Sequence, residues 1–183
     1  MLFLFRFTFA LGLVIVIFSD LETLLIPDLI SLPGIALGLA ASLVIHPHTG
    51  VGWMSSLIGA AAGAAVVMLV RTVYWLVFHM EGMGFGDVKL MGMIGAFLGY
   101  ESLVFVFFAG SLQGLLYAAA SWLAGARQPP VPTDGGAPPG AGEAPATFRR
   151  MVVPFGPFLG LAALEWLFFS QVFIDLLNDL FML

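Results

Sequence analysis

The chain has 183 residues, of which 61% are hydrophobic and only 9% are charged. Soluble domains are about 45–50% apolar and about 25% charged. This composition therefore excludes an ordinary soluble enzyme, a nucleic-acid-binding protein with a basic patch, and a disordered chain. The apolar runs are long and do not alternate in segments of roughly ten residues, which excludes a transmembrane barrel. The sequence has no cysteine, so disulfides, zinc–thiolate sites and thiol catalysis are also excluded.

Six apolar runs predict six transmembrane helices, and thus an all-α polytopic membrane protein with one domain over residues 1–183. The expected spans cover residues 2–18, 29–45, 53–78, 88–99, 103–123 and 154–174, and a short amphipathic tail follows at 175–183. No small-residue cleavage site follows the first run, so we interpret it as a retained span rather than a signal peptide. The third run is rich in Gly and Ala, which let membrane helices approach closely, and we expect it to be the central helix.

Three interruptions separate these runs. Residues 46–50 (HPHTG) predict a turn, and the glycines of residues 82–86 are expected to break the helix. Residues 125–150 are rich in Pro, Gly and Ala, which predicts a flexible loop. This loop is either a tether or a segment that influences substrate entry. The histidines (His46, His48 and His79) do not form a helical i, i+4 ligand pair, so we assign neither a metal nor a cofactor.

The basic residues indicate an orientation. Lys89 and the arginines at 127, 149 and 150 lie in or beside the loops that follow the first, third and fifth spans. Arg71 lies in the half of its span nearer that side, and Arg6 alone lies near the other. Cytoplasmic loops are enriched in Lys and Arg, so we expect these three loops in the cytoplasm and both termini outside.

Most of the acids beside the membrane gather at this cytoplasmic side. Asp20, Glu22 and Asp28 follow the first span, and Glu81 and Asp87 follow the third. An even number of crossings separates the two groups, so Asp20 and Asp87 can meet. Two facing carboxyls share one proton and can activate a water, as in aspartic proteases.

Each of these acids also has a structural interpretation, as an interfacial residue or a helix cap. Asp28 fits the cap best, because it follows Pro27 and precedes a span. Lys89 could meet a lipid phosphate or a substrate acid, or could simply follow the positive-inside rule. Arg71 and Glu165 lie at similar depths, and a pair between them would lower the cost of burying either charge.

Three segments resemble motifs of the type IV prepilin peptidases. Residues 20–28 (DLETLLIPD), followed by Leu32-Pro33, resemble their first aspartate motif, and residues 82–90 (GMGFGDVKL) resemble their second, the GxGD motif. Residues 154–157 (PFGP) resemble a third shared segment at the start of the last helix. The resemblance covers about residues 10–172.

This resemblance implies an intramembrane aspartic endopeptidase that removes the short basic leader of prepilins or pseudopilins at the cytoplasmic face of the inner membrane. It implies that Asp20 and Asp87 are the catalytic pair. The other residues expected to contact substrate are acids at the cytoplasmic ends of the spans, glycines whose missing Cβ admits a peptide strand, and the PFGP segment. They are Glu22, Asp28, Gly84, Gly86, Pro154, Gly156 and Pro157. Membrane lipid is an expected partner, and nucleic acid is not.

The chain departs from many bacterial members, which carry an additional N-terminal part with four cysteines and methylate the new N-terminus. It resembles the short form instead, so methyltransferase activity is not expected. Two other interpretations stay open. One is another GxGD protease, related to signal-peptide peptidase or presenilin, although those have different residues around the first aspartate and a Pro-Ala-Leu motif later. The other is a transport protein or a non-catalytic scaffold with acids in the membrane.

Overall fold

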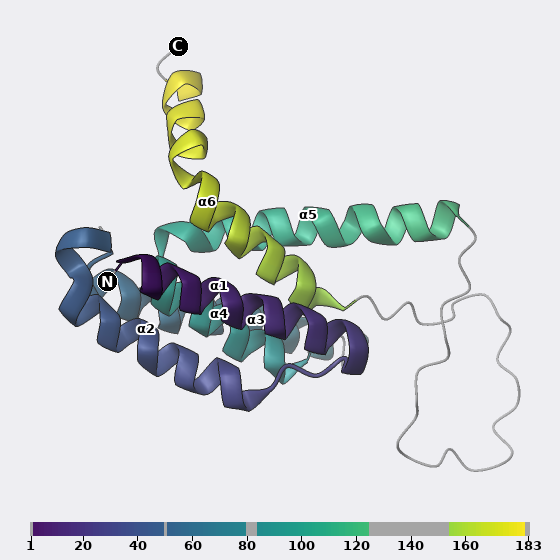
Figure 1. Ribbon diagram of the computed structural model, residues 1–183. Coiled ribbons are helices and arrows are strands. Elements are labelled where there is room, and N and C mark those ends of the chain that lie inside the picture. The colour runs from purple at the N-terminus through teal and green to yellow at the C-terminus, as the bar shows by residue number, and fades with distance from the viewer. Residues whose placement is uncertain (1, 50, 80–83, 125–153, 182–183) are drawn as a thin grey trace, which may run out of the picture.

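The computed structural model describes residues 2–49, 51–79, 84–124 and 154–181. Every regular element in these residues is a helix, and the six helices follow in the expected order (Figure 1). Their bounds are α1 Leu2–Thr23, α2 Asp28–Thr49, α3 Trp53–Phe78, α4 Phe85–Leu98, α5 Glu101–Leu123 and α6 Phe155–Phe181. The predicted loop at 125–150 and Glu81 lie outside the described residues.

Four of the helices in the described residues, α1, α3, α5 and α6, are long and apolar enough to cross a membrane. A shorter apolar helical stretch, Asp28–Val44, lies within α2, and α4 has only 14 residues. A bilayer core about 30 Å thick needs about 20 helical residues. The all-α, polytopic membrane fold is therefore confirmed, and α4 is the shortest of the six helices described.

The central helix is α4, not α3 as the Gly- and Ala-rich sequence predicted. Ten of the 14 residues of α4 are buried, whereas only 28% of the membrane-crossing window of α3 is buried. The small residues of α3 do permit a close approach, because a Cβ on Gly59 would collide with the carbonyl oxygen of Gly95, and one on Gly63 would lie 2.6 Å from the carbonyl oxygen of Met91. The glycines of α3 therefore let α4 pack closely against α3, which buries α4.

The glycines of α2 hold α4 from another side. A Cβ on Gly38 would lie 2.9 Å from the Cβ of Ala96, and one on Gly34 would collide with the side chain of Met93. Phe9 of α1 stacks on Phe97 with ring centroids 4.5 Å apart. This packing fixes the axial position of α4, and with it the position of the acid in its first turn.

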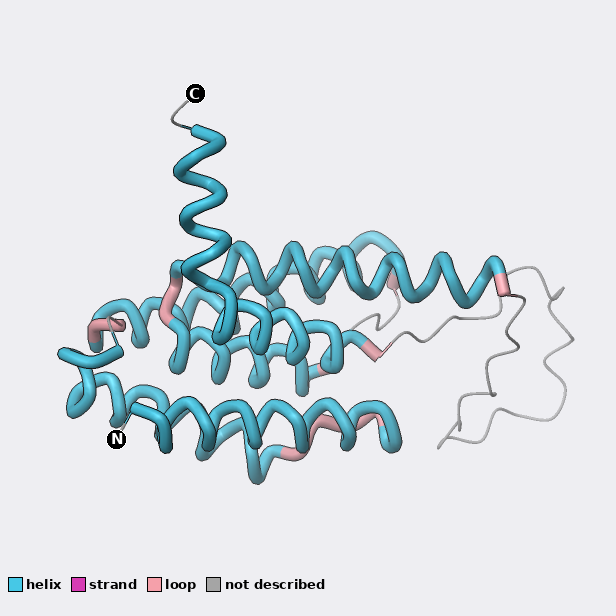
Figure 2. The backbone as a smooth tube through the Cα atoms, turned by 45° about the horizontal axis from the view of Figure 1, so that its top comes forward, coloured by secondary structure: helices cyan, strands magenta, loops and turns pink. Residues whose placement is uncertain are grey.

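Three element boundaries differ from the prediction. Helix α2 continues through residues 46–49, where a turn was expected, because one proline removes only one intrahelical hydrogen bond and the helix tolerates it near its end. Helix α4 begins at Phe85 rather than near residue 88, because Gly84 takes the extended N-cap conformation. Helix α6 continues through the predicted tail to Phe181, and its last part projects away from the other helices in both views (Figures 1 and 2).

Candidate active site at one end of the bundle

Asp20 lies in the last turn of α1, and its side chain is only 6% exposed. The backbone N–H of Gly156, the second residue of α6, donates a hydrogen bond to its carboxylate. Helix α1 then ends abruptly, because Leu24 adopts a left-handed φ of 55°. The hydroxyl of Ser19 donates to the carbonyl of Leu25 over 3.1 Å, which folds the following segment back toward the helix end.

Asp87 lies in the first turn of α4 and is 7% exposed. Gly84 is the N-cap residue, and its backbone N–H donates to the Asp87 carboxylate. An acid three residues after the N-cap that accepts from the N-cap N–H is one half of a capping box. The structural interpretation of Asp87 therefore applies, but capping alone does not require an acid to be buried.

The two carboxyl groups lie close enough to interact. Burial and, to a smaller extent, the negative charge of Asp20 together raise the pKa of Asp87 from 3.8 to about 7, although the hydrogen bond from the Gly84 N–H opposes both effects. The two aspartates are 67 residues apart in sequence, and their interaction agrees with the expectation that they can meet. Two facing carboxyls disfavour ionising together, which favours their sharing one proton.

Ile26 packs beside Gly86, the residue before Asp87, and beside Gly156, which donates a hydrogen bond to Asp20. A Cβ on Gly86 would lie 2.8 Å from the Cβ of Ile26. A Cβ on Gly156 would lie 3.1 Å from the Cδ1 of Ile26 and 2.7 Å from the Oδ2 of Asp20. A Cβ at either position would displace a neighbouring atom, because Ile26 and the Asp20 carboxylate already occupy the space around it.

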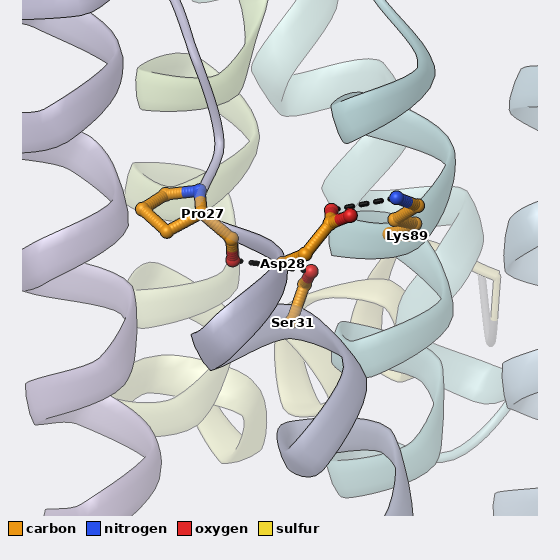
Figure 3. A network of polar contacts seen from close by, with 4 residues as sticks. All are labelled: Pro27, Asp28, Ser31 and Lys89. Atoms are coloured by element: carbon orange, nitrogen blue, oxygen red, sulfur yellow. Dashed lines mark hydrogen bonds and ion pairs between the residues drawn. The ribbon is translucent and has the colours of Figure 1, made fainter.

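Asp28 is the first residue of α2 rather than its cap (Figure 3). The carbonyl of Pro27 instead accepts the first hydrogen bonds, from the N–H groups of residues 30 and 31 and from the hydroxyl of Ser31. The Asp28 carboxylate forms an ion pair of 2.6 Å with Lys89 of α4. The prediction of an N-cap is therefore wrong by one residue, and the ion pair links the first turns of α2 and α4.

Glu22 is exposed at the end of α1, and Pro154 and Pro157 flank Gly156 at the start of α6. These residues therefore lie at the same end of the bundle as the two aspartates. Among the residues it describes, no three His, Asp or Glu side chains gather closely enough to hold a metal ion.

The polar residues deeper in the chain are paired differently from the expectation. Glu165 accepts a hydrogen bond of 2.9 Å from the amide nitrogen of Gln113 on α5, so its partner is an amide rather than Arg71. The Arg71 guanidinium carbon lies 5.3 Å from the centroid of the Phe85 ring, and Lys89 lies 5.6 Å from the same centroid. Phe85 thus receives two cations on its ring.

Sequence reasoning missed Ile26, Phe85 and Gln113. Ile26 and Phe85 are apolar residues in an apolar chain, so their contacts depend on the path of the chain rather than on their type. Gln113 could have been found, because an amide within a membrane span needs a polar partner.

The chain matches the family model described as the "Type IV leader peptidase family" over residues 7–119. It is 38% identical to the "Prepilin leader peptidase/N-methyltransferase" of Escherichia coli (strain K12) over 123 residues. The matched segment is 67% of this chain and 51% of that protein. The protein of the same description from Dichelobacter nodosus is 32% identical over 169 residues, 92% of this chain and 50% of that protein. No solved structure matches the chain.

The fold and the paired acids thus define a polytopic membrane protein with a candidate hydrolytic site. The chain belongs to the type IV leader peptidase family. It spans about half the length of the curated relatives named above.

Proposed function

We propose that the chain is an aspartic endopeptidase that cleaves within or beside the membrane. The observation that carries this proposal is the pair of buried aspartates, Asp20 and Asp87, whose carboxyls interact across α1 and α4. Burying two acids side by side costs free energy, and a structural cap would need only one of them. Family membership supports the peptidase assignment, because its matched segment contains both residues.

In the proposed reaction, the two carboxyls share one proton and hold a water between them. The ionised carboxylate takes a proton from the water as its oxygen attacks the scissile carbonyl carbon, and the protonated carboxyl donates to the carbonyl oxygen. The tetrahedral intermediate then collapses, the C–N bond breaks, and a proton passes to the leaving amine. The N–H groups of Gly156 and Gly84 orient the two carboxylates by donating to them.

The proposed substrates are prepilins or pseudopilins with short basic leader peptides. The names of the two relatives, both prepilin leader peptidases, support this substrate class. Glu22 is exposed beside the pair, and Asp28 is also exposed although it pairs with Lys89. These acids suit a basic leader by charge. Gly84 and Gly86, together with Pro154, Gly156 and Pro157, border the pair and would line the extended segment of the substrate.

The relatives are also named as N-methyltransferases. We propose peptidase activity alone, because the observation behind the proposal, the pair of interacting aspartates, bears on peptide hydrolysis. The assay is the mass of the processed pilin, since methylation adds one methyl group to its new N-terminus. A methylated product made by the purified chain would contradict this part of the proposal.

The decisive experiment is co-expression with a panel of prepilins and measurement of leader removal. Asp20→Asn and Asp87→Asn should each reduce cleavage at least 1,000-fold, because asparagine can neither accept nor donate the transferred proton. Asp175→Asn, at the far end of α6, is the matched control and should cleave normally. Normal cleavage by either dyad variant would refute the aspartic mechanism, and cleavage of other membrane peptides but no prepilin would favour another GxGD protease.

The proposed location is the bacterial inner membrane, with the aspartates at the cytoplasmic face and both termini outside. Because the chain has no cysteine, one introduced cysteine reports its own accessibility. Glu22→Cys, next to the proposed site and exposed, should react with a membrane-impermeant maleimide in inverted vesicles and not in intact spheroplasts. The reverse pattern would overturn the orientation.

A further inference from the structure

We infer that a cavity at the end of the bundle opposite the aspartates binds an anionic phospholipid, with the lipid phosphate on Arg6. Arg6 precedes Asp20 by 14 residues, which is about 21 Å along α1, and the cavity lies at the end where α1 begins (Figure 1). It is partly open and has a volume of about 90 Å³. Its lining includes four aromatic and two polar residues from α1, α4 and α6, namely Phe5, Phe9, Phe97, Trp166, Arg6 and Ser170.

Arg6 is an exposed cation in an apolar helix. It lies within Phe3–Thr23, the part of α1 that is long and apolar enough to cross a membrane. Among the residues that the structure describes, none forms a hydrogen bond or an ion pair with its side chain. A charge in a span is costly unless it finds a partner or reaches the headgroup layer. Arg6 is only about 6 Å from the start of α1, so its side chain can extend to a lipid phosphate.

Ser170 of α6 supplies a second polar group to the same cavity. Its hydroxyl makes no hydrogen bond within the described part of the chain, whereas Ser102 and Ser121 each donate to the carbonyl three residues before them. A guanidinium forms two parallel hydrogen bonds with a phosphate, and a hydroxyl donates to a phosphate or an ester carbonyl. Arg6 and Ser170 thus offer a phospholipid the donors that its polar part requires.

The apolar wall of the cavity is held in place by contacts between its own rings. Phe5 and Phe9 stack on Phe97 with ring centroids 4.8 and 4.5 Å apart, and Trp166 packs on Phe105 with centroids 5.3 Å apart. A volume of about 90 Å³ equals that of about three water molecules. It therefore accepts a few methylene groups of one acyl chain, while the phosphate lies at the mouth beside Arg6.

The charge of the lining selects among phospholipids. None of the described lining residues is an acid, so the ammonium of a zwitterionic lipid such as phosphatidylethanolamine has no carboxylate to meet and is repelled by Arg6. Phosphatidylglycerol carries a net negative charge and has no such group. Because α1, α4 and α6 all line the cavity, a bound lipid links three helices and stabilises the folded chain.

The test is the melting temperature of the purified full-length chain in detergent, titrated separately with phosphatidylglycerol, phosphatidylethanolamine and inorganic phosphate. We expect phosphatidylglycerol to raise it most and to remain bound in native mass spectra. Arg6→Gln should weaken the apparent affinity for phosphatidylglycerol by about tenfold or more. Ser170→Met should also weaken it, because the longer side chain fills part of the cavity.

The matched control is the double variant Arg6→Leu/Leu4→Arg. It keeps the charge in the same turn but moves it about 200° around α1, to a position that is 64% exposed. This variant should bind phosphatidylglycerol as weakly as Arg6→Gln does. Binding at the wild-type level would overturn the inference, because Arg6 would then be an ordinary interfacial charge. If Ser170→Met does not fold, this double variant decides the question.

An equal response to phosphatidylethanolamine or to inorganic phosphate would overturn the assignment of an anionic lipid. So would an absence of any lipid effect together with a change in oligomeric state in Arg6→Gln, since the partner of Arg6 would then be an acid of a second copy. The measurement does not depend on cleavage, and no variant alters Asp20 or Asp87. Its outcome is therefore independent of the proposed peptidase activity.

Discussion

Gly156→Ala tests the geometry of the candidate site most directly. The added Cβ would lie 2.7 Å from the Oδ2 of Asp20 and 3.1 Å from the Cδ1 of Ile26, so at least one of these atoms must move by several tenths of an ångström. A functional group tolerates a displacement of only about 0.5 Å, and 1 Å can cost about 100-fold in rate. We therefore expect leader removal to slow by about 10- to 100-fold, which corresponds to about 1.4–2.7 kcal/mol in the barrier.

The stability of this variant should change little in comparison. Alanine is favoured over glycine in a helix by about 0.5–1 kcal/mol, which offsets part of the strain from the contact. The assay is the rate of leader removal in proteoliposomes, with the melting temperature measured on the same preparation. Gly12→Ala in α1 is the matched control. Its added Cβ would lie 3.7 Å from its nearest neighbour, the Cγ2 of Ile30, which is an ordinary van der Waals contact. Cleavage by Gly156→Ala at the wild-type rate would refute the reasoning.

Three further predictions concern charge and polarity. Between about pH 4 and pH 7 the folded chain keeps on Asp87 a proton that the unfolded chain has lost, because its pKa rises from 3.8 to about 7; stability should therefore fall as the pH rises, by at most about 1.4 kcal/mol per unit. Asp87→Asn should lack this slope in melting temperatures measured from pH 4 to 7, and an equal slope in both proteins would contradict the assignment. The Asp28–Lys89 pair should show a coupling of only about 0.2–1 kcal/mol in a double-mutant cycle, because the Asp28 side chain is 59% exposed; a coupling above about 2 kcal/mol would show that the pair is more shielded than its exposure indicates. Gln113→Ala should destabilise the protein by about 1–3 kcal/mol, since it removes the donor to Glu165. Glu165→Gln, which can still accept that hydrogen bond, should cost less in the same thermal assay, and equal losses would argue against the bond.

The helices and the proximity of the two aspartates could both be predicted from the sequence. Long apolar runs have few alternatives to a helix in lipid, and counting crossings placed Asp20 and Asp87 at one end. It did not predict that α4 is central. In a membrane protein, a buried face and a lipid-facing face are both apolar, so composition does not separate a core helix such as α4 from an outer one such as α3.

The surroundings of the aspartates were harder to predict. Ile26 reaches both glycines because Leu24 turns the chain in a left-handed conformation, which non-glycine residues adopt uncommonly. No sequence pattern indicates such a turn at a leucine. The Asp28–Lys89 pair likewise depends on the axial position of α4, which the glycines of α2 and α3 determine.

The hydrogen bond from Gly156 to Asp20 also sets an order of events during synthesis. Asp20 and Asp87 leave the ribosome early, on α1 and α4, but the N–H that orients Asp20 belongs to α6, the last of the six helices. A nascent chain that has inserted only its first four helices therefore has both acids without that donor. The complete arrangement forms only when α6 packs against α1, so any activity that depends on it begins after the sixth helix has been made.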